Sequence, residues 1–352
     1  MRAWLLFIGL LFVAGCDPSE GSGPGEPEKE DPVTGLRWAV GFTGEGALAV
    51  FDAASGAVVS TAPGSGTSGR KDIAVDAAKR VWVLEQEEEG GEIRVCPLTG
   101  SPPALGACAH WVWVDGVAAL WPMPGGMVVF EDGYGPRWKV LRDDGAPAKG
   151  VWSPRPASVW AEGTTLHSLT YGQDGAALER RSATIGGVAV PSGTAPWGLP
   201  ATEPPSTRFA PLGDGGVLVD ALEGDVALRW VEDDVVGPAM LLGVGPGIER
   251  VEAAAGLEGA VIALTTDRAV IAAVENGKGV GAASVPLPEG VRRENLFFSR
   301  DLLVTGPARA LVATEAGVVA IGVQRTAGGV TAFRDGQFAG LRGPLAAVPD
   351  LE

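Results

Sequence analysis

Histidine and cysteine are scarce in this 352-residue chain, and its positive charges are outnumbered by negative ones. Two histidines and three cysteines leave little material for imidazole catalysis or for a metal centre. With 27 Lys and Arg against 43 Asp and Glu, the formal net charge is −16, which excludes a nucleic-acid binder that works by neutralising phosphates. Helical periodicity is nearly absent, so a helical bundle is excluded as well.

Glycine and proline are abundant instead. The chain contains 53 glycines and 27 prolines along its whole length, while 46% of its residues are hydrophobic. That apolar content is sufficient for a substantial core, and so many turn-forming residues favour short elements joined by tight turns. We therefore expect an all-β chain.

The first sixteen residues are typical of a secretion signal. After one positive charge comes an uncharged stretch of 13 residues, AWLLFIGLLFVAG, which is too short to cross a bilayer as a helix. Val13, Ala14, Gly15 and Cys16 then resemble a bacterial lipobox, in which small residues admit the signal peptidase and the cysteine sulfur receives a diacylglyceryl group. This resemblance implies a signal peptide over residues 1–15 and a lipidated Cys16. The alternative is an ordinary secretory signal with an incidental cysteine.

Residues 16–35 comprise the cysteine and a predicted tether. The sequence DPSEGSGPGEPEKEDPVTG is rich in glycine, proline and acids, so it cannot bury apolar surface. Each buried acyl methylene contributes about 0.8 kcal/mol, and two or three acyl chains would hold the protein on a membrane. Asp17 resembles the signal that retains enterobacterial lipoproteins in the inner membrane. We expect a location in the bacterial cell envelope, on the periplasmic face of either membrane or on the surface.

The other two cysteines flank a turn-rich stretch. Cys96 and Cys108 enclose PLTGSPPALGA between two strand-like runs. In an oxidising compartment they are expected to form a disulfide worth about 3 kcal/mol. A pair of buried thiols is the alternative, whereas a metal site lacks further ligands at suitable spacing.

Short apolar runs continue from residue 36 onward. Most are four to eight residues long, rich in β-branched and aromatic residues, and bounded by Gly, Pro, Asp or Asn. Ala54-Ser55-Gly56 and Asp335-Gly336 are among the turn sequences that predict hairpins between such strands. The alanine-rich segment 248–264 is interrupted by glycines, and we interpret it as strand, turn and strand.

Groups of three or four strands recur about every 44 residues, which is typical of the four-stranded blade of a propeller. One group begins near residue 109. Val50-Phe51-Asp52, Ser55-Gly56, Val58-Val59 and the run IAVD at 73–76 resemble the YVTN-type β-propeller repeat, and the following RVWVL is similar to NHL-like repeats.

The resemblance implies an all-β fold, a β-propeller over residues 36–345 with seven four-stranded blades; six or eight blades stay open. Residues 346–352 would form a C-terminal tail. A propeller commonly closes by placing a strand from one end of the chain in the blade begun by the other. We expect residues 317–323 and 329–333 to complete the blade that starts at Trp38.

No pattern in the chain indicates catalysis, so no catalytic residue, metal ligand or cofactor is assigned. His110 and His167 lie in strand-like runs outside any Ser-His-Asp arrangement, and the glycine-rich stretches lack a P-loop lysine. The acidic clusters lack the alternating spacing of a calcium loop, and we expect them at hairpin tips.

The function we expect is binding. Ten tryptophans follow Cys16, and tryptophans of a propeller usually pack between blades, with a minority free to stack on a ligand. We expect a monomeric, membrane-tethered, non-enzymatic module for a protein or another envelope ligand. An enzyme with acids in the central channel, such as a metal-dependent lactonase or a quinone-cofactor dehydrogenase, is the main alternative, and a purely structural envelope protein is another.

Overall fold

The computed structural model divides the chain into two compact units, Met1–Val33 and Thr34–Glu352. It describes residues 35–349 except for 65–70, 88–89, 115–116, 124–125, 132–136, 143–150, 153–155, 163–164, 172–176, 185–193, 201–206, 214, 276–277, 289, 291–299 and 327–328. The predicted signal peptide, Cys16 and nearly all of the tether lie outside the described residues. Within the described part, no helix has the length and apolar character needed to cross a membrane.

The regular elements of the described residues are β-strands, grouped in seven antiparallel sheets, which confirms the all-β expectation. Sheet 1 contains β1 (Trp38–Thr43), β2 (Leu48–Asp52), β3 (Val58–Ala62) and β30 (Leu341–Ala347). Sheet 2 contains β4 (Lys71–Val75), β5 (Arg80–Glu87), β6 (Gly90–Thr99), β7 (Ala104–Leu105) and β8 (Ala109–Val114). Sheet 3 contains β9 (Val117–Met123), β10 (Gly126–Glu131), β11 (Arg137–Arg142) and β12 (Val151–Trp152).

The remaining sheets also take their strands in chain order. Sheet 4 contains β13 (Pro156–Glu162), β14 (Thr165–Tyr171), β15 (Ala177–Thr184) and β16 (Thr194–Pro200). Sheet 5 contains β17 (Arg208–Leu212), β18 (Gly215–Leu222), β19 (Asp225–Glu232), β20 (Val235–Val236) and β21 (Met240–Leu241). Sheet 6 contains β22 (Val251–Leu257), β23 (Ala260–Thr265), β24 (Arg268–Glu275) and β25 (Lys278–Pro286). Sheet 7 contains β26 (Leu302–Gly306), β27 (Arg309–Thr314), β28 (Gly317–Thr326) and β29 (Gly329–Phe338).

The central strands are apolar on both faces because each sheet packs against two others. On β23, Val261 and Ala263 contact sheet 5, whereas Ile262 and Leu264 contact sheet 7. Successive side chains of a strand point to opposite faces, so a sheet covered on both sides needs an unbroken apolar run. This explains why the chain contains runs such as AVIAL in place of alternating polar and apolar residues.

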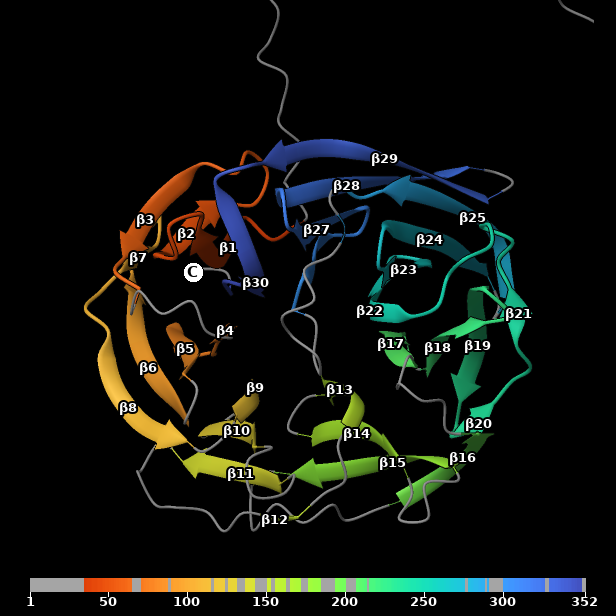
Figure 1. Cartoon of the computed structure of the whole chain (residues 1–352), viewed down its shortest axis with the longest axis horizontal. Coiled ribbons are helices and arrows are strands. Elements are labelled where there is room, and N and C mark those ends of the chain that lie inside the picture. The colour runs from red at the N-terminus through yellow and green to blue at the C-terminus, as the bar shows by residue number, and fades with distance from the viewer. Residues whose placement is uncertain are drawn as a thin grey trace, which may run out of the picture. The chain divides into compact units, whose positions relative to one another are not determined.

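Seven hydrophobic clusters of described residues lie between consecutive sheets. Six of them join sheet 1 to sheet 2 and so on up to sheet 7, and the other joins sheet 7 to sheet 1. Figure 1 shows the sheets following one another in chain order, with β4, β9, β13, β17 and β22 at the inner edges of sheets 2 to 6 and β30 at the inner edge of sheet 1. The core is thus divided among the contacts between sheets, and no single layer of the fold contains it.

The last strand of the chain pairs with the first. β30 lies antiparallel to β1, and the Val348 N–H donates a 3.0 Å hydrogen bond to the Trp38 carbonyl. Our expectation that residues 317–323 and 329–333 fill this place was wrong, because they belong to β28 and β29 of sheet 7. β30 was missed because Gly343 and Pro344 interrupt its sequence; the proline is tolerated since the strand pairs on one side only.

Several local predictions can be compared with the described residues. The segment 248–264 contains β22, a turn and β23, as expected, and the turn at Ala54-Ser55-Gly56 joins β2 to β3. Asp335-Gly336 is not a hairpin turn but an irregularity inside β29, where the register with β28 shifts. The group expected to begin near residue 109 starts later, because β8 pairs with β6 and completes sheet 2.

Candidate binding site

The residues predicted to carry the anchor, Val13, Ala14, Gly15 and Cys16, lie outside the described part of the chain.

Cys96 and Cys108 form a disulfide that links β6 to the residue before β8. It connects two strands of one sheet and encloses the short strand β7. The disulfide therefore cross-links the outer part of sheet 2.

The two imidazoles are in different sheets and share no site. His110 on β8 has its Nδ1 2.9 Å from Glu92 Oε1. His167 on β14 is buried and stacks on the Trp160 indole, with ring centroids 5.4 Å apart. Among the residues that the structure describes, no group of three His, Cys, Asp or Glu side chains is placed to hold a metal ion.

A buried ion pair joins three sheets close to their first strands. Asp72 Oδ1 on β4 lies 3.0 Å from Nε of Arg300, which precedes β26. Asp72 Oδ2 accepts a 2.7 Å hydrogen bond from the Leu120 N–H on β9. The Arg300 guanidinium also donates to the carbonyls of Ile73 and Leu120. Burial raises the pKa of Asp72, although Arg300 and the backbone N–H groups of Leu120 and Ile73 act in the opposite direction.

Other polar side chains of first strands also bond to the backbone of the next sheet. Ser158 Oγ on β13 accepts a 3.1 Å hydrogen bond from the Phe209 N–H on β17. Arg208 Nε on β17 donates a 2.9 Å hydrogen bond to the Glu252 carbonyl on β22. These groups and the Asp72 pair replace water as partners for the backbone near the middle of the fold. Their hydrogen-bonding capacity serves to join sheets.

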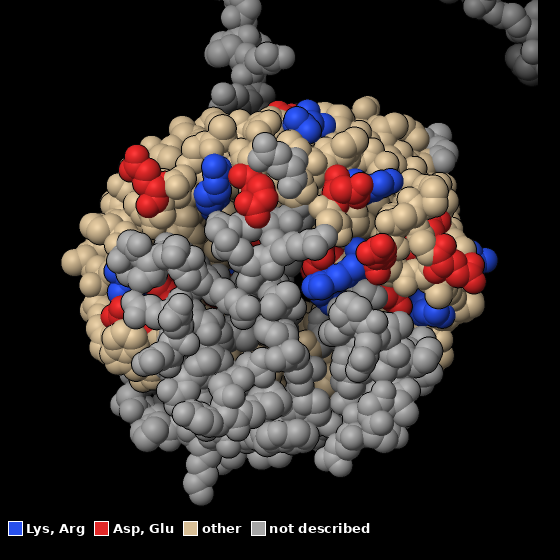
Figure 2. Space-filling model, in the orientation of Figure 1, with Lys and Arg blue, Asp and Glu red and all other residues tan. Residues whose placement is uncertain are grey.

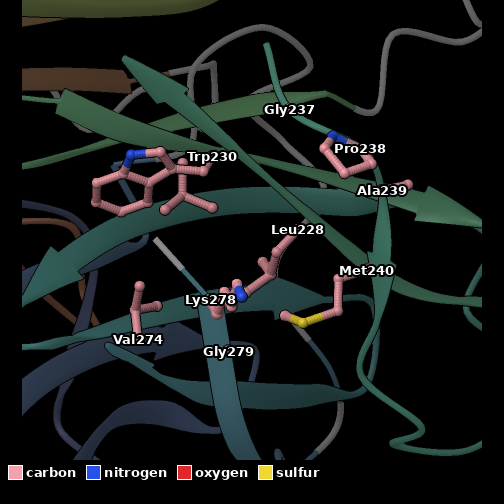
Figure 3. A pocket seen from close by; sticks show the side chains of 10 residues that line it. Leu228, Trp230, Gly237, Pro238, Ala239, Met240, Val274, Lys278 and Gly279 are labelled. Atoms are coloured by element: carbon pink, nitrogen blue, oxygen red, sulfur yellow. The ribbon is translucent and has the colours of Figure 1, made fainter. Parts of the chain in front are cut away.

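An apolar pocket of about 200 Å³ lies between sheets 5 and 6, away from the first strands. Its wall comes from β18, β19, β21, β24, β25 and the segment before β21, and Figure 3 shows these side chains around a common space. The lining residues are Val217, Leu228, Trp230, Gly237, Pro238, Ala239, Met240, Val274, Lys278 and Gly279. A space of this size and composition accepts an apolar side chain or a small apolar ligand.

Gly279 makes room for a neighbouring side chain of the pocket lining. A Cβ atom on Gly279 would lie 2.2 Å from the Met240 methyl carbon, so the absence of a side chain there leaves room for Met240. Leu241 and Val280, the chain neighbours of these two residues, are 45% and 40% exposed. Lys278 adds a positive charge to the lining. The pocket therefore has an apolar lining with one cation, and two exposed apolar residues lie next to lining residues in the chain.

Charges of both signs lie next to one another on the surface. Figure 2 shows acidic and basic side chains interspersed over the described residues of one face. Arg268 pairs with Asp267, Arg309 with Asp335 and Arg325 with Glu275. Pairing of this kind uses these three basic side chains locally.

Most tryptophans whose side chains are described pack between sheets, as expected. Trp38, Trp82, Trp121, Trp138 and Trp160 are buried in the clusters described above. Two others differ, because Trp230 borders the pocket and Trp113 is 60% exposed on β8.

The pocket itself was missed by the sequence analysis. Its walls come from residues 217 to 279, and each contributing segment reads in isolation as an ordinary strand. A weak signal was present in GPAMLLGVGPG, an apolar stretch too rich in glycine to be a regular strand.

Comparisons with known proteins identify the fold but no family. The sequence matches no family model and no curated protein. A functionally unknown protein from Desulfotomaculum acetoxidans is similar in structure, with a TM-score of 0.64 and 11% identity over 89% of this chain and 100% of that one. Hsv2 from Kluyveromyces lactis has a TM-score of 0.58 and 8% identity, and the match covers 89% and 96% of the two chains.

A third similar structure is that of a proposed 6-phosphogluconolactonase from Bacteroides uniformis. Its TM-score is 0.57 at 13% identity, and the match covers 88% of this chain and 98% of that one. At identities this low the likeness concerns the fold alone. The chain is accordingly an all-β protein of propeller-like architecture.

Proposed function

We propose that the chain is a lipid-anchored protein of the bacterial cell envelope whose sheets form a closed, seven-bladed propeller that binds a protein or another envelope ligand. The lipobox-like run ending at Cys16 and the acidic tether support the anchor. The pairing of β30 with β1 and the cluster between sheets 7 and 1 support closure. A location on the periplasmic face of either membrane or on the surface follows from the anchor.

The pocket between sheets 5 and 6 carries the binding part of the proposal. Leu241 and Val280 are exposed apolar neighbours, along the chain, of the lining residues Met240 and Gly279, and apolar surface of this kind is stabilised when a partner's apolar side chain removes it from water. Full burial of one such side chain stabilises a complex by about 1.5–3 kcal/mol. The polar groups of the first strands, by contrast, already bond to neighbouring sheets.

Photo-crosslinking in living cells tests the binding proposal. A photoreactive residue at Val280 of the full-length protein is expected to yield a discrete adduct. Gly279→Val should abolish that adduct, because the new side chain displaces Met240 into the pocket while suiting a strand. Gly340→Val is the matched control, since no atom lies within 4 Å of the added Cβ. An adduct that persists in Gly279→Val, or no adduct at all, would refute this site.

The anchor has a separate test. Cys16→Ser is expected to move the protein from the membrane fraction to the soluble fraction, because the acylated sulfur is lost. The Gly340→Val protein serves as the membrane-bound control. Continued membrane retention of Cys16→Ser would contradict lipidation without bearing on the pocket.

The enzyme alternative makes a different demand on the fold. It needs acids in the central channel that are free to bind a metal or to transfer protons. The carboxylate of Asp72, the buried acid of β4, is instead ion-paired with Arg300 and accepts a hydrogen bond from the Leu120 N–H. Its geometry supports a role in joining sheets, and we therefore place function at the outer strands.

A further inference from the structure

The outer edge of sheet 2 carries a second surface, distinct from the pocket in both place and chemistry. Trp113 on β8 is 60% exposed, although the other tryptophans named above are buried or border the pocket. His110, on the same strand, has its ring centroid 5.8 Å from that of Trp113. Glu92 on β6 contacts the imidazole at 2.9 Å.

A β-bulge brings these side chains to one face. Glu92 pairs with Trp113 and Arg94 pairs with His110, while the register shifts between these two pairs. The extra residue is Trp111, which packs with Val112 against the cluster shared with sheet 3. In a regular strand, residues 110 and 113 would point to opposite faces. The bulge reverses this and sets the imidazole beside the exposed indole, which is a recurrent use of bulges.

The hydrogen bond between His110 and Glu92 determines what the surface offers. An ionised carboxylate accepts hydrogen bonds and donates none, so the proton of the contact resides on His110 Nδ1. In the neutral imidazole, Nε2 is then an acceptor. The second oxygen of Glu92 is also an acceptor, and the described residues provide no partner for it. Two acceptors therefore flank one flat aromatic face.

We propose that Trp113, His110 and Glu92 form a carbohydrate-binding platform for an uncharged glycan of the envelope. The face of an indole carries negative charge density that attracts the polarised C–H groups on the flat side of a pyranose ring. Adjacent hydroxyl or amide N–H groups of the sugar can donate to Glu92 and His110 Nε2. An anionic glycan is disfavoured, because Glu92 is negative and the whole chain has a net charge of −16.

The row of polar side chains behind Trp113 supports the platform. Arg94 donates a 2.5 Å hydrogen bond to the buried carboxylate of Glu85 on β5. Glu85 pairs with Glu92 across the strands, so Arg94 compensates the charge next to Glu92 from within the sheet. The acceptor geometry at the surface thus rests on groups that are fixed below it.

Calorimetric titration of the full-length protein in mild detergent tests the proposal, with chitotetraose as the neutral probe and a polygalacturonate fragment as the anionic one. We expect chitotetraose to bind and polygalacturonate not to bind. Trp113→Ala should weaken chitotetraose binding at least tenfold, and Glu92→Gln about threefold or more. Trp113→Phe should restore part of the affinity, because a smaller aromatic face remains.

Phe333→Ala is the matched control, since Phe333 is a 48% exposed aromatic residue on the outer strand of another sheet. Its affinity for chitotetraose should equal that of the unmodified protein. The proposal is overturned if Trp113→Ala binds chitotetraose normally, or if neither chitotetraose nor cellotetraose binds. It is also overturned if tetramethylammonium displaces the sugar in a Trp113-dependent way, because the platform would then recognise cations. None of these outcomes bears on the pocket, which lies between other sheets.

Discussion

Replacing Arg300 by methionine should destabilise the fold more than a typical surface substitution. Arg300→Met keeps most of the side-chain length but leaves the Asp72 carboxylate buried without its cation. Removing one partner of a buried pair costs about 3–5 kcal/mol, and the partial exposure of Arg300 places the expected loss near the lower end, at about 3 kcal/mol. For a unit of roughly 310 residues, this corresponds to a fall in melting temperature of about 5 °C.

The dependence on pH distinguishes this reasoning from a simple loss of packing. Because burial raises the pKa of Asp72 above 3.8, the folded protein binds more protons than the unfolded chain between that value and the folded pKa. The contribution of Asp72 to stability therefore falls as the pH rises through this window. Without Arg300 the pKa rises further, so the penalty of Arg300→Met should shrink as the pH is lowered toward this raised pKa.

Urea unfolding of both single variants and of the double variant measures the interaction. Asp72→Asn should cost about 2 kcal/mol, since Arg300 retains two carbonyl acceptors. The double variant Asp72→Asn/Arg300→Met should cost about 2 kcal/mol less than the sum of the single variants. A penalty for Arg300→Met below about 1 kcal/mol, or one that does not shrink on acidification, would refute the assignment of a buried ion pair.

Three further variants probe local features. The double variant Cys96→Ser/Cys108→Ser should lower the free energy of unfolding by about 3 kcal/mol and make the melting temperature insensitive to reductant. A melting temperature equal to that of the parent would contradict this. Gly56→Ala introduces a Cβ 2.4 Å from the Phe338 ring at a φ of +74°, so urea unfolding should show a loss of about 1–3 kcal/mol, and no loss would argue against the turn. Trp82→Phe removes an indole N–H that donates a 2.8 Å hydrogen bond to a buried carboxylate. It should lower the free energy of unfolding by about 1–2 kcal/mol. A urea unfolding curve identical to that of the parent would contradict this.

The strands were predictable from the sequence because the residue composition of each strand reflects whether its two faces are covered by other sheets. Runs such as AVIAL are apolar throughout, since the sheets on both sides bury alternate residues of the same strand. The turn at Gly56 was predictable because its positive φ favours glycine. The cysteines could be paired from their positions beside two strands, and the disulfide joins those two residues.

The assignments that failed depend on contacts between distant segments. β30 contains a proline and becomes a strand only because β1, some 300 residues earlier in the chain, supplies its partner. β8 was assigned to the wrong group because its pairing with β6 is not visible in either strand alone. The pocket and the bulge at Trp111 likewise arise from the packing of several strands, for which local composition provides no signal.

The location of polar groups in the fold predicts a separation between stability and binding. Near the first strands, Asp72 and Arg300 bond to neighbouring sheets, so changes there alter folding. On the outer strands, Trp113 is exposed, and its truncation should change the free energy of unfolding by less than about 0.5 kcal/mol. Asp72→Asn should accordingly lower stability and, below its melting temperature, leave chitotetraose affinity intact, while Trp113→Ala should do the reverse. Urea unfolding and calorimetry on the same two preparations measure both quantities. If Asp72→Asn weakened sugar binding as much as Trp113→Ala, the two regions would be coupled. The inference that the inner strands determine stability and the outer strands determine binding would then be wrong.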